Sequence, residues 1–229
     1  MLSIAIPCYN EEEIIGKTVS DLVGALKIAN VSYELILVDN GSFDKTPIIL
    51  KKLANRHIRI LTLDQNRGFG GGVIAGLKEG TGDYISFTCA DGQVSPEEII
   101  RLYKIAQEKD VAVVKGDRRK NYKSFFRRFV SRCYHLFVML LFPVRVHDVN
   151  GYPILFRKDV LKAIHLSVND WIIQVQMLSN VTRKGYKIVE LPITYYERKG
   201  GRSHIKFSSI FTIFFQLIRY RIWRTLHEH

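Results

Sequence analysis

The sequence predicts an α/β fold in which a mostly parallel central sheet carries helices on both faces. Strand-like and helix-like segments alternate over residues 1–115, and this alternation is typical of parallel sheets. Polar motifs follow three of the strand-like runs directly, at the sheet edge where such folds bind ligands. A chain of 229 residues with 47% hydrophobic content can bury one large core. We therefore expect a single α/β domain.

In the first half, short apolar runs predict strands at residues 2–7, 33–38, 58–63, 84–88 and 111–115. The segments between them predict helices at residues 11–29, 46–55, 70–80 and 95–108. Acidic residues in the expected first turn of the first helix favour its start. Ser95 predicts the start of the fourth helix as a capping residue, because proline and two acids follow it.

The second half is less regular. Its patterns predict helices at residues 122–142, 171–184 and 208–226, and strands at residues 152–156 and 188–196. Pro192 lies inside the last strand, and proline is confined to sheet edges, so we expect that strand at an edge.

The chain is basic, with a net charge of +12 that is concentrated in its second half. Such a charge suits a polyanionic partner: nucleic acid, anionic lipid or a phosphorylated substrate. We expect no nucleic-acid partner, because no motif of a known nucleic-acid-binding module is present. Three cysteines without metal-ligand spacing, and no secretory leader, favour a reduced cytosolic setting.

Five short motifs carry the candidate chemistry, at residues 3–12, 36–42, 66–70, 89–93 and 198–204. Asp39 ends an apolar strand, where a carboxylate can accept hydrogen bonds from a base or ribose, or can form a turn. The glycine-rich segment after Asn66 precedes a helix, so it suits either an anion at bare helix amides or a tight turn alone.

In order and spacing these motifs resemble family 2 glycosyltransferases, most closely the polyprenyl-phosphate (dolichol-phosphate mannose synthase-like) branch. The resemblance implies a GT-A domain over residues 1–207, with a nucleotide-binding half (1–115) and an acceptor half (116–207). Residues 208–229 would then form an amphipathic helix that contacts a membrane surface or another subunit. The implied reaction is inverting transfer of a sugar from GDP-mannose or a UDP-sugar to dolichyl or undecaprenyl phosphate.

The resemblance also implies binding roles. The nucleotide would be bound by residues at the strand ends: Pro7, Tyr9, Asn10, Glu11, Asp39, Gly41, Ser42, Asn66, Gly68 and Ala90. Asp91 and Gln93 would hold Mg²⁺ or Mn²⁺ against the diphosphate. Cys89 stands where the family has the first acid of Asp-x-Asp. Three interpretations follow: a working site with a weaker metal, a site with a different metal preference, or a degenerate site.

Arginines after the fifth strand are candidates for binding phosphate, because guanidinium groups bind phosphate bidentately. The catalytic set implied by the resemblance is Asp91, Arg118, Arg132, Arg198 and Ser203, and the acceptor phosphate set is Arg128, Asp148 and His204. The arginines could instead form a solvated basic face. Asp148 could orient a basic group or the sugar, or cap a loop. Ile172 and Gln176 stand where relatives often have acids.

The apolar run at residues 210–223 is too short to span a membrane, which takes roughly 20 residues, and its arginines suit an interfacial helix. We expect a protein peripheral on the cytoplasmic face of a membrane, with a homo-oligomer or a membrane-protein partner as further possibilities. The alternative to an interfacial helix is a core or dimer helix. Two other functions stay open: transfer to a saccharide hydroxyl, with Asp148 or Asp170 as base, and a non-catalytic nucleotide-sugar-binding protein.

Overall fold

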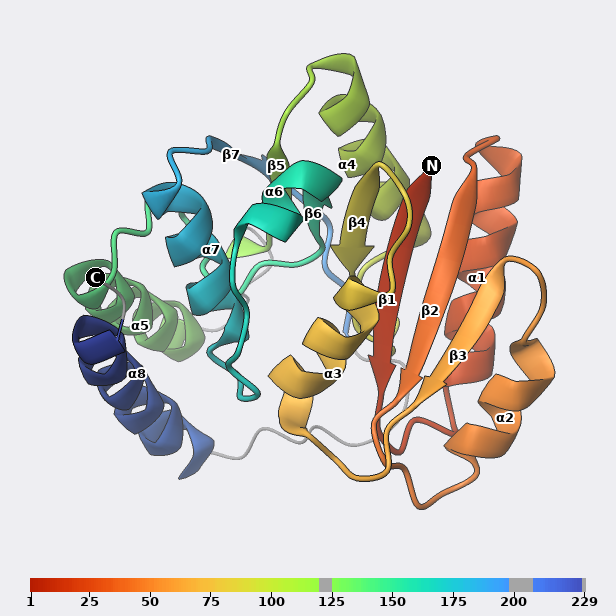
Figure 1. Ribbon diagram of the computed structural model, residues 1–229, viewed down its shortest axis with the longest axis horizontal. Helices are drawn as coiled ribbons and strands as arrows, with labels where there is room; N and C mark the ends of the chain where they lie inside the picture. The colour runs from red at the N-terminus through yellow and green to blue at the C-terminus, as the bar shows by residue number, and fades with distance from the viewer. Residues whose placement is uncertain (120–124, 198–207, 228–229) are drawn as a thin grey trace.

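The protein forms one seven-stranded sheet in a computed structural model that describes residues 1–119, 125–197 and 208–227 (Figure 1). The strands are β1 (Leu2–Cys8), β2 (Tyr33–Asp39), β3 (Ile58–Thr62), β4 (Tyr84–Phe87), β5 (Val113–Asp117), β6 (Ile154–Arg157) and β7 (Ile188–Pro192). Their order is β3-β2-β1-β4-β6-β5-β7. Only β6 runs antiparallel, against both β4 and β5. The prediction of a mostly parallel sheet is confirmed.

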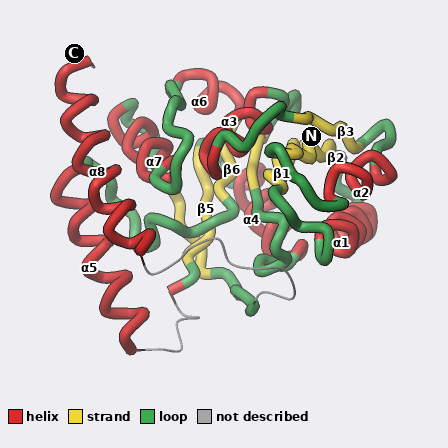
Figure 2. Tube along the Cα trace, turned by 90° about the horizontal axis from the view of Figure 1, so that it is seen from below, coloured by secondary structure: helices red, strands yellow, loops and turns green. Residues whose placement is uncertain are grey.

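Helices cover both faces of this sheet, as expected. They are α1 (Ile15–Ile28), α2 (Thr46–Leu53), α3 (Gly68–Lys78), α4 (Pro96–Glu108), α5 (Phe125–Leu141), α6 (Lys158–Ala163), α7 (Ile173–Arg183) and α8 (Ser208–His227). α3, α6 and α7 lie on one face and α1 and α4 on the other, in both views (Figures 1 and 2). α5 and α8 pack together beside α7, through rings such as Phe137 and Phe214.

The central strands are buried on both faces, because near-continuous apolar runs build parallel sheets between helices. Leu2, Ile4 and Ile6 of β1 have no exposed surface. α3 comes close to β1 at Gly76, where an ideal Cβ atom would lie 2.7 Å from the Cβ of Ala5. The carboxyl ends of the parallel strands β1 to β4 lie at the lower edge in Figure 1, whereas antiparallel β6 runs the opposite way.

Three details of the predicted helices differ from the structure: one helix start, one cap and one helix that was missed. α1 begins at Ile15 and has no acid in its first turn, because the amide of Glu11 is bound instead to the hydroxyl of Thr46 at 2.8 Å. α4 begins at Pro96 as expected, but among the described contacts the Ser95 side chain makes no capping hydrogen bond. α6 was not predicted, since its six residues are too few to show a helical period. Pro192 ends β7 at one edge of the sheet, as predicted.

Candidate active site

The loops that follow β1 and β2 are joined side by side at the carboxyl edge of the sheet, onto which Figure 2 looks. Cys8 and Asp39 are register partners at the two strand ends. The amide of Asn10 donates to the Ser42 hydroxyl at 3.1 Å, and the Asn10 side chain accepts from the amide of Phe43 at 3.0 Å. Asn10 has a φ of 55°, a conformation that asparagine tolerates better than most residues. The structure therefore brings the predicted nucleotide-binding residues of both loops together.

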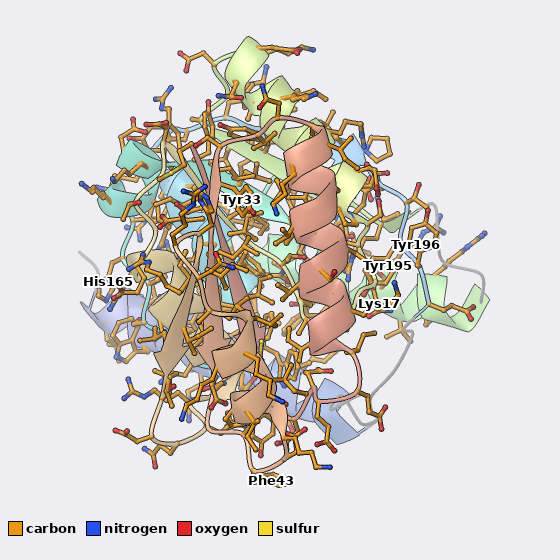
Figure 3. The ribbon with its side chains drawn as sticks, turned by 90° about the vertical axis from the view of Figure 1, so that its right-hand side faces the viewer. Lys17, Tyr33, Phe43, His165, Tyr195 and Tyr196 are labelled. Atoms are coloured by element: carbon orange, nitrogen blue, oxygen red, sulfur yellow. The ribbon has the colours of Figure 1, made fainter. Side chains whose placement is uncertain are left out.

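Asp39 is 3% exposed, and its Oδ1 accepts the amide of Ser42 at 3.0 Å. The carboxylate therefore does form the turn that the sequence offered as an alternative. Turn formation uses one oxygen of a group with about four acceptor positions, so a role toward base or ribose stays a prediction. Tyr9 places its ring edge-on against Phe43, with 6.0 Å between centroids, and Phe43 lies at the lower end of the molecule in Figure 3.

The glycine-rich start of α3 is matched to another segment of the chain. An ideal Cβ atom on Gly70 would lie 2.3 Å from the carbonyl oxygen of Val168. The amide of Gly71 donates to the Asn169 carbonyl at 3.3 Å, and the amide of Gly68 donates to the Asn66 side chain at 2.7 Å. The expectation of bare amides is therefore wrong at these two positions. The glycines let the chain's own residues 168–170 approach, and anion binding by Asn66 and Gly68 stays a prediction.

Gln176 holds that segment in place from α7. Its side-chain oxygen accepts the amides of Ser167 at 2.9 Å and Val168 at 3.0 Å, and its nitrogen donates to the Ser167 hydroxyl at 3.1 Å. Only an uncharged amide can both accept and donate in this way. Gln176 and Ile172 are both buried, so this part of the site carries no acid of α7.

Asp91 is the carboxylate of the predicted metal motif. It is 9% exposed, and its Oδ1 accepts the amide of Gln93 at 3.1 Å. Gln93, the second predicted metal ligand, has both ends of its side chain in protein hydrogen bonds: Oε1 accepts from the Tyr195 hydroxyl at 2.8 Å, and Nε2 donates to the Tyr196 carbonyl at 3.1 Å. The carbonyl of Ala90 accepts from Thr18 at 2.9 Å. Asp91 is thus the one carboxylic acid of this motif.

The thiol of Cys89 cannot replace the missing acid. Burial, and then the charge of Asp91, raise the pKa of Cys89 well above its usual range, so the thiol stays neutral near pH 7. Among the described residues, no group of three or more His, Cys, Asp or Glu side chains is placed to hold a metal ion. Mg²⁺ is often bound through only one or two carboxylates plus substrate phosphates. Asp91 fits that kind of site, in which the diphosphate supplies most of the ligands.

Arg118 is fixed by Asp148. Its Nε and one terminal nitrogen donate to the two Asp148 oxygens at 2.9 and 3.2 Å, and its backbone amide donates at 3.0 Å. The guanidinium carbon lies 5.3 Å from the ring centroid of Tyr152 and 5.2 Å from that of Tyr195. Asp148 therefore orients a basic group, the first of the roles expected for it.

Lys115 and Glu190 support this ion pair, and the sequence analysis did not select them. Lys115 is fully buried, contacts the carbonyl of Asp148, and lies 3.2 Å from Glu190 Oε1. Burial lowers the pKa of Lys115, while Asp148 and Glu190 act in the opposite direction. The available signal was a lysine inside an otherwise apolar strand, which needs a buried countercharge. Tyr152 and Tyr195 were also missed, since both sat in predicted strands without a recognisable pattern.

Five predicted phosphate-binding or catalytic residues remain, two on α5 and three beyond the part of the chain that the structure describes. Arg128 and Arg132 have exposed side chains on α5. Arg198, Ser203 and His204 lie outside the described residues. Their expected roles toward phosphate stay predictions.

A groove of about 1100 Å³ lies between α1 and α4 and adjoins Cys89. Lys17 and Tyr196 line it, and both are labelled on that side of the molecule in Figure 3. None of the predicted nucleotide-binding residues is among its lining residues. The groove is therefore next to the candidate site and separate from the carboxyl edge that holds the chemistry.

A family model described as Glycosyl transferase family 2 matches residues 3–165, well over half of the chain. The chain belongs to glycosyl transferase family 2. This membership accounts for the strand-end motifs and confirms the resemblance of the sequence.

Curated relatives of this family-2 chain are undecaprenyl-phosphate 4-deoxy-4-formamido-L-arabinose transferases. The protein from Photorhabdus laumondii is 31% identical over 221 residues, which cover 95% of this chain. The protein from Proteus mirabilis is 28% identical over 220 residues. The chain spans 66% of the length of these relatives, just under two thirds.

Solved structures confirm the GT-A fold. Glucosyl-3-phosphoglycerate synthase from Mycobacterium tuberculosis in complex with phosphoglyceric acid superimposes with a TM-score of 0.75 at 18% identity, over 98% of this chain and 79% of that one. The same enzyme in complex with Mn²⁺, UDP and glucosyl-3-phosphoglycerate gives a TM-score of 0.73 at 18% identity, over 96% of this chain and 79% of that one. At this identity the likeness supports the fold alone.

Proposed function

We propose that this chain is an inverting glycosyltransferase that moves a sugar from a nucleotide-diphosphate sugar to a polyprenyl phosphate. The observation that carries the proposal is that Asp91 and Arg118 both contact Tyr152: the Tyr152 hydroxyl lies 3.5 Å from Asp91 Oδ2, and the Arg118 guanidinium carbon lies 5.3 Å from the Tyr152 ring centroid. A carboxylate and a fixed guanidinium at one edge of a sheet suit a diphosphate between them. The names of the family-2 relatives, which include undecaprenyl phosphate as acceptor, support the lipid.

The proposed reaction needs no strong base. An acceptor phosphate is already ionised near neutral pH, so its oxygen can attack the anomeric carbon as the bond to the leaving diphosphate breaks. The electron pair of that bond moves onto the diphosphate, whose growing charge Arg118 can stabilise from its fixed position. Asp91 would hold a divalent metal, Mg²⁺ or Mn²⁺, which neutralises charge on the diphosphate when bound. Arg132, Arg198 and Ser203 remain proposed further contacts to phosphate.

A saccharide hydroxyl as acceptor would need a general base, and this separates the two enzymatic proposals. Burial would raise the pKa of Asp148, but Arg118 and Lys115 outweigh burial and lower it. A carboxylate with a lowered pKa, already bound to arginine at two oxygens, is a poor base. Asp170 is then the remaining candidate. The state of Asp148 therefore favours a phosphate acceptor.

The first test is calorimetric titration of UDP and of GDP into the purified chain, with and without Mn²⁺. We expect one nucleotide to bind, and Mn²⁺ to tighten it, because Asp91 supplies a carboxylate. Transfer is then assayed with the matching sugar nucleotide, using undecaprenyl phosphate in vesicles and a soluble saccharide as alternative acceptors. Transfer to the saccharide alone would support the hydroxyl alternative, and binding of neither nucleotide would support the non-catalytic one.

α5 and α8 form a proposed membrane-contacting surface for the lipid acceptor. Large apolar side chains are exposed on both helices: Phe129, Leu136, Met139, Leu140, Phe215, Ile218, Ile222, Trp223 and Leu226. Exposed arginines at 128, 132, 219 and 221 lie among them. Apolar side chains with flanking cations suit the interface of an anionic membrane. Among the described residues, no helix is both long and apolar enough to cross a bilayer.

We expect Ile222→Glu with Leu226→Glu to weaken binding to anionic vesicles by roughly 10²- to 10⁴-fold, because burying each of the two side chains is worth about 1.5–3 kcal/mol. The measurement is sedimentation with phosphatidylglycerol vesicles at two salt concentrations. Ile28→Glu is the matched control, since Ile28 is 90% exposed on α1. Unchanged vesicle binding with a loss of dimer in solution would instead assign the surface to a second subunit.

A further inference from the structure

A line of hydrogen bonds runs from Tyr195, which follows β7, through Tyr152 toward Asp91. The Tyr152 and Tyr195 hydroxyl oxygens are 2.7 Å apart, and Tyr152 Oη also lies 3.5 Å from Asp91 Oδ2. Tyr195 Oη is 2.8 Å from Gln93 Oε1, and Gln93 Nε2 is 3.1 Å from the Tyr196 carbonyl. The Tyr152 hydroxyl also lies within hydrogen-bond reach of the Cys89 side chain. The two hydroxyl protons therefore have four possible acceptors: the other tyrosine, Gln93, Asp91 and the weakly accepting sulfur of Cys89.

The Tyr196 carbonyl decides where these two protons go. A carbonyl only accepts, so it fixes the Gln93 side chain with its nitrogen toward Tyr196 and its oxygen toward Tyr195. The Gln93 oxygen then takes the proton of Tyr195. The oxygen of Tyr195 in turn takes the proton of Tyr152 at 2.7 Å, which is much shorter than the 3.5 Å distance to Asp91.

We infer that Tyr195 is a positioning residue that holds the hydroxyl proton of Tyr152 away from Asp91, so that this carboxylate remains an acceptor for a divalent cation. The inference rests on the proposed function and assigns a role to two tyrosines outside the motifs. It also gives Gln93 a different task from the predicted one: its amide orients the tyrosines. The arrangement matters because Asp91 is the one acid of its motif, in which Cys89 stands at the position of the first acid.

The structure predicts opposite effects for the two hydroxyls. Without the Tyr195 hydroxyl, the proton of Tyr152 is left with the Asp91 carboxylate and the Cys89 sulfur as acceptors. The carboxylate is the stronger of the two, so the proton would compete with the cation for the same Asp91 oxygen. A hydrogen bond to a charged group is strong enough to weaken binding of the cation by about tenfold. Without the Tyr152 hydroxyl that competition cannot occur. Removing Tyr152 as well as Tyr195 should therefore restore cation binding.

The experiment measures how much Mn²⁺ tightens UDP and GDP binding to the full chain by calorimetry, for Tyr195→Phe, Tyr152→Phe and the double variant. We expect the Mn²⁺ effect to fall by about tenfold in Tyr195→Phe, and to equal the wild-type effect in the other two. Tyr196→Phe is the matched control, because Tyr196 contributes its backbone to the line of hydrogen bonds. Phenylalanine keeps the rings beside Arg118 in every variant.

A wild-type Mn²⁺ effect in Tyr195→Phe, or a double variant as weak as Tyr195→Phe, would overturn the inference. A loss of the Mn²⁺ effect in Tyr152→Phe would also overturn the inference, because the Tyr152 hydroxyl would then support Asp91 directly. The measurement on Tyr152→Phe tests the inference even if Tyr195→Phe does not fold. Wild-type protein that binds nucleotide without any Mn²⁺ effect would reject the proposed metal role, and the inference with it. The failure of the inference alone is thus distinguishable from the failure of the proposed function.

Discussion

Asp91→Asn is expected to lower the rate of sugar transfer by about 10²–10³-fold, the size of effect seen when one preorganised electrostatic group is removed. Asparagine keeps the oxygen that accepts the Gln93 amide at 3.1 Å, so the turn should be retained. What is lost is the charge, and neutral Cys89 cannot replace it. The effect should therefore appear in kcat and in the Mn²⁺ dependence, with little change in thermal stability.

Asp64→Asn is the matched control for this variant. Asp64 is an exposed carboxylate that follows β3 at the same edge of the sheet. We expect its kcat to equal that of the wild type. A transfer rate that is unchanged in Asp91→Asn would reject the role assigned to Asp91, whatever the control shows.

Asp148→Asn is expected to lower the free energy of unfolding by about 3–5 kcal/mol, the cost of breaking a buried ion pair by removing one partner. Arg118 and Asp148 have side chains that are only 11% and 4% exposed. Removing the carboxylate leaves the guanidinium with less countercharge, and it also weakens the environment of fully buried Lys115. Urea unfolding of the two proteins at pH 7 measures the difference.

The same pair predicts an acid dependence. The folded-state pKa of Asp148 lies below its ordinary value of 3.8 because Arg118 and Lys115 outweigh the effect of burial. A carboxylate with a lowered pKa stabilises the protein above its unfolded-state pKa, and this stabilisation is lost as the pH falls through the folded-state pKa. The difference between wild type and Asp148→Asn should therefore shrink below about pH 4.

Asp159→Asn is the control for Asp148→Asn. Asp159 also pairs with an arginine, Arg157, but the two side chains are 57% and 33% exposed. Exposed pairs contribute about 0–1 kcal/mol, so the control should unfold close to the wild type. Equal losses in both variants would contradict the account of Asp148, since burial would then have no effect on the cost.

The elements and the edge of the sheet that carries the site follow from local sequence. Apolar runs predicted every strand to within a few residues, because buried parallel strands need continuous apolar side chains. The strand-end motifs also predicted that the loops carrying Asn10 and Ser42 lie together. Local patterns of this kind act within one element or one turn.

Long-range partners were beyond such patterns. The fit of Gly70 to Val168 and the bond of Arg118 to Asp148 each join segments that no periodicity connects. The sequence therefore left several roles open for Asp148, and it gave no sign that Tyr152 and Tyr195 pair. Charges, buried amides and hydroxyls acquire their roles only when packing determines which neighbour each one meets.

The position of β6 has a consequence for how the chain can be divided. β6 comes from the second half, yet it lies between β4 and β5, two strands of the first half. A fragment that stopped after β5 would expose the backbone edge of β4 and leave β5 without both of its neighbours. Open strand edges of this kind pair with other chains and aggregate. The segments before and after β5 therefore build one sheet together, and we expect them to unfold as one cooperative unit that neither evolution nor an experimenter could divide at β5.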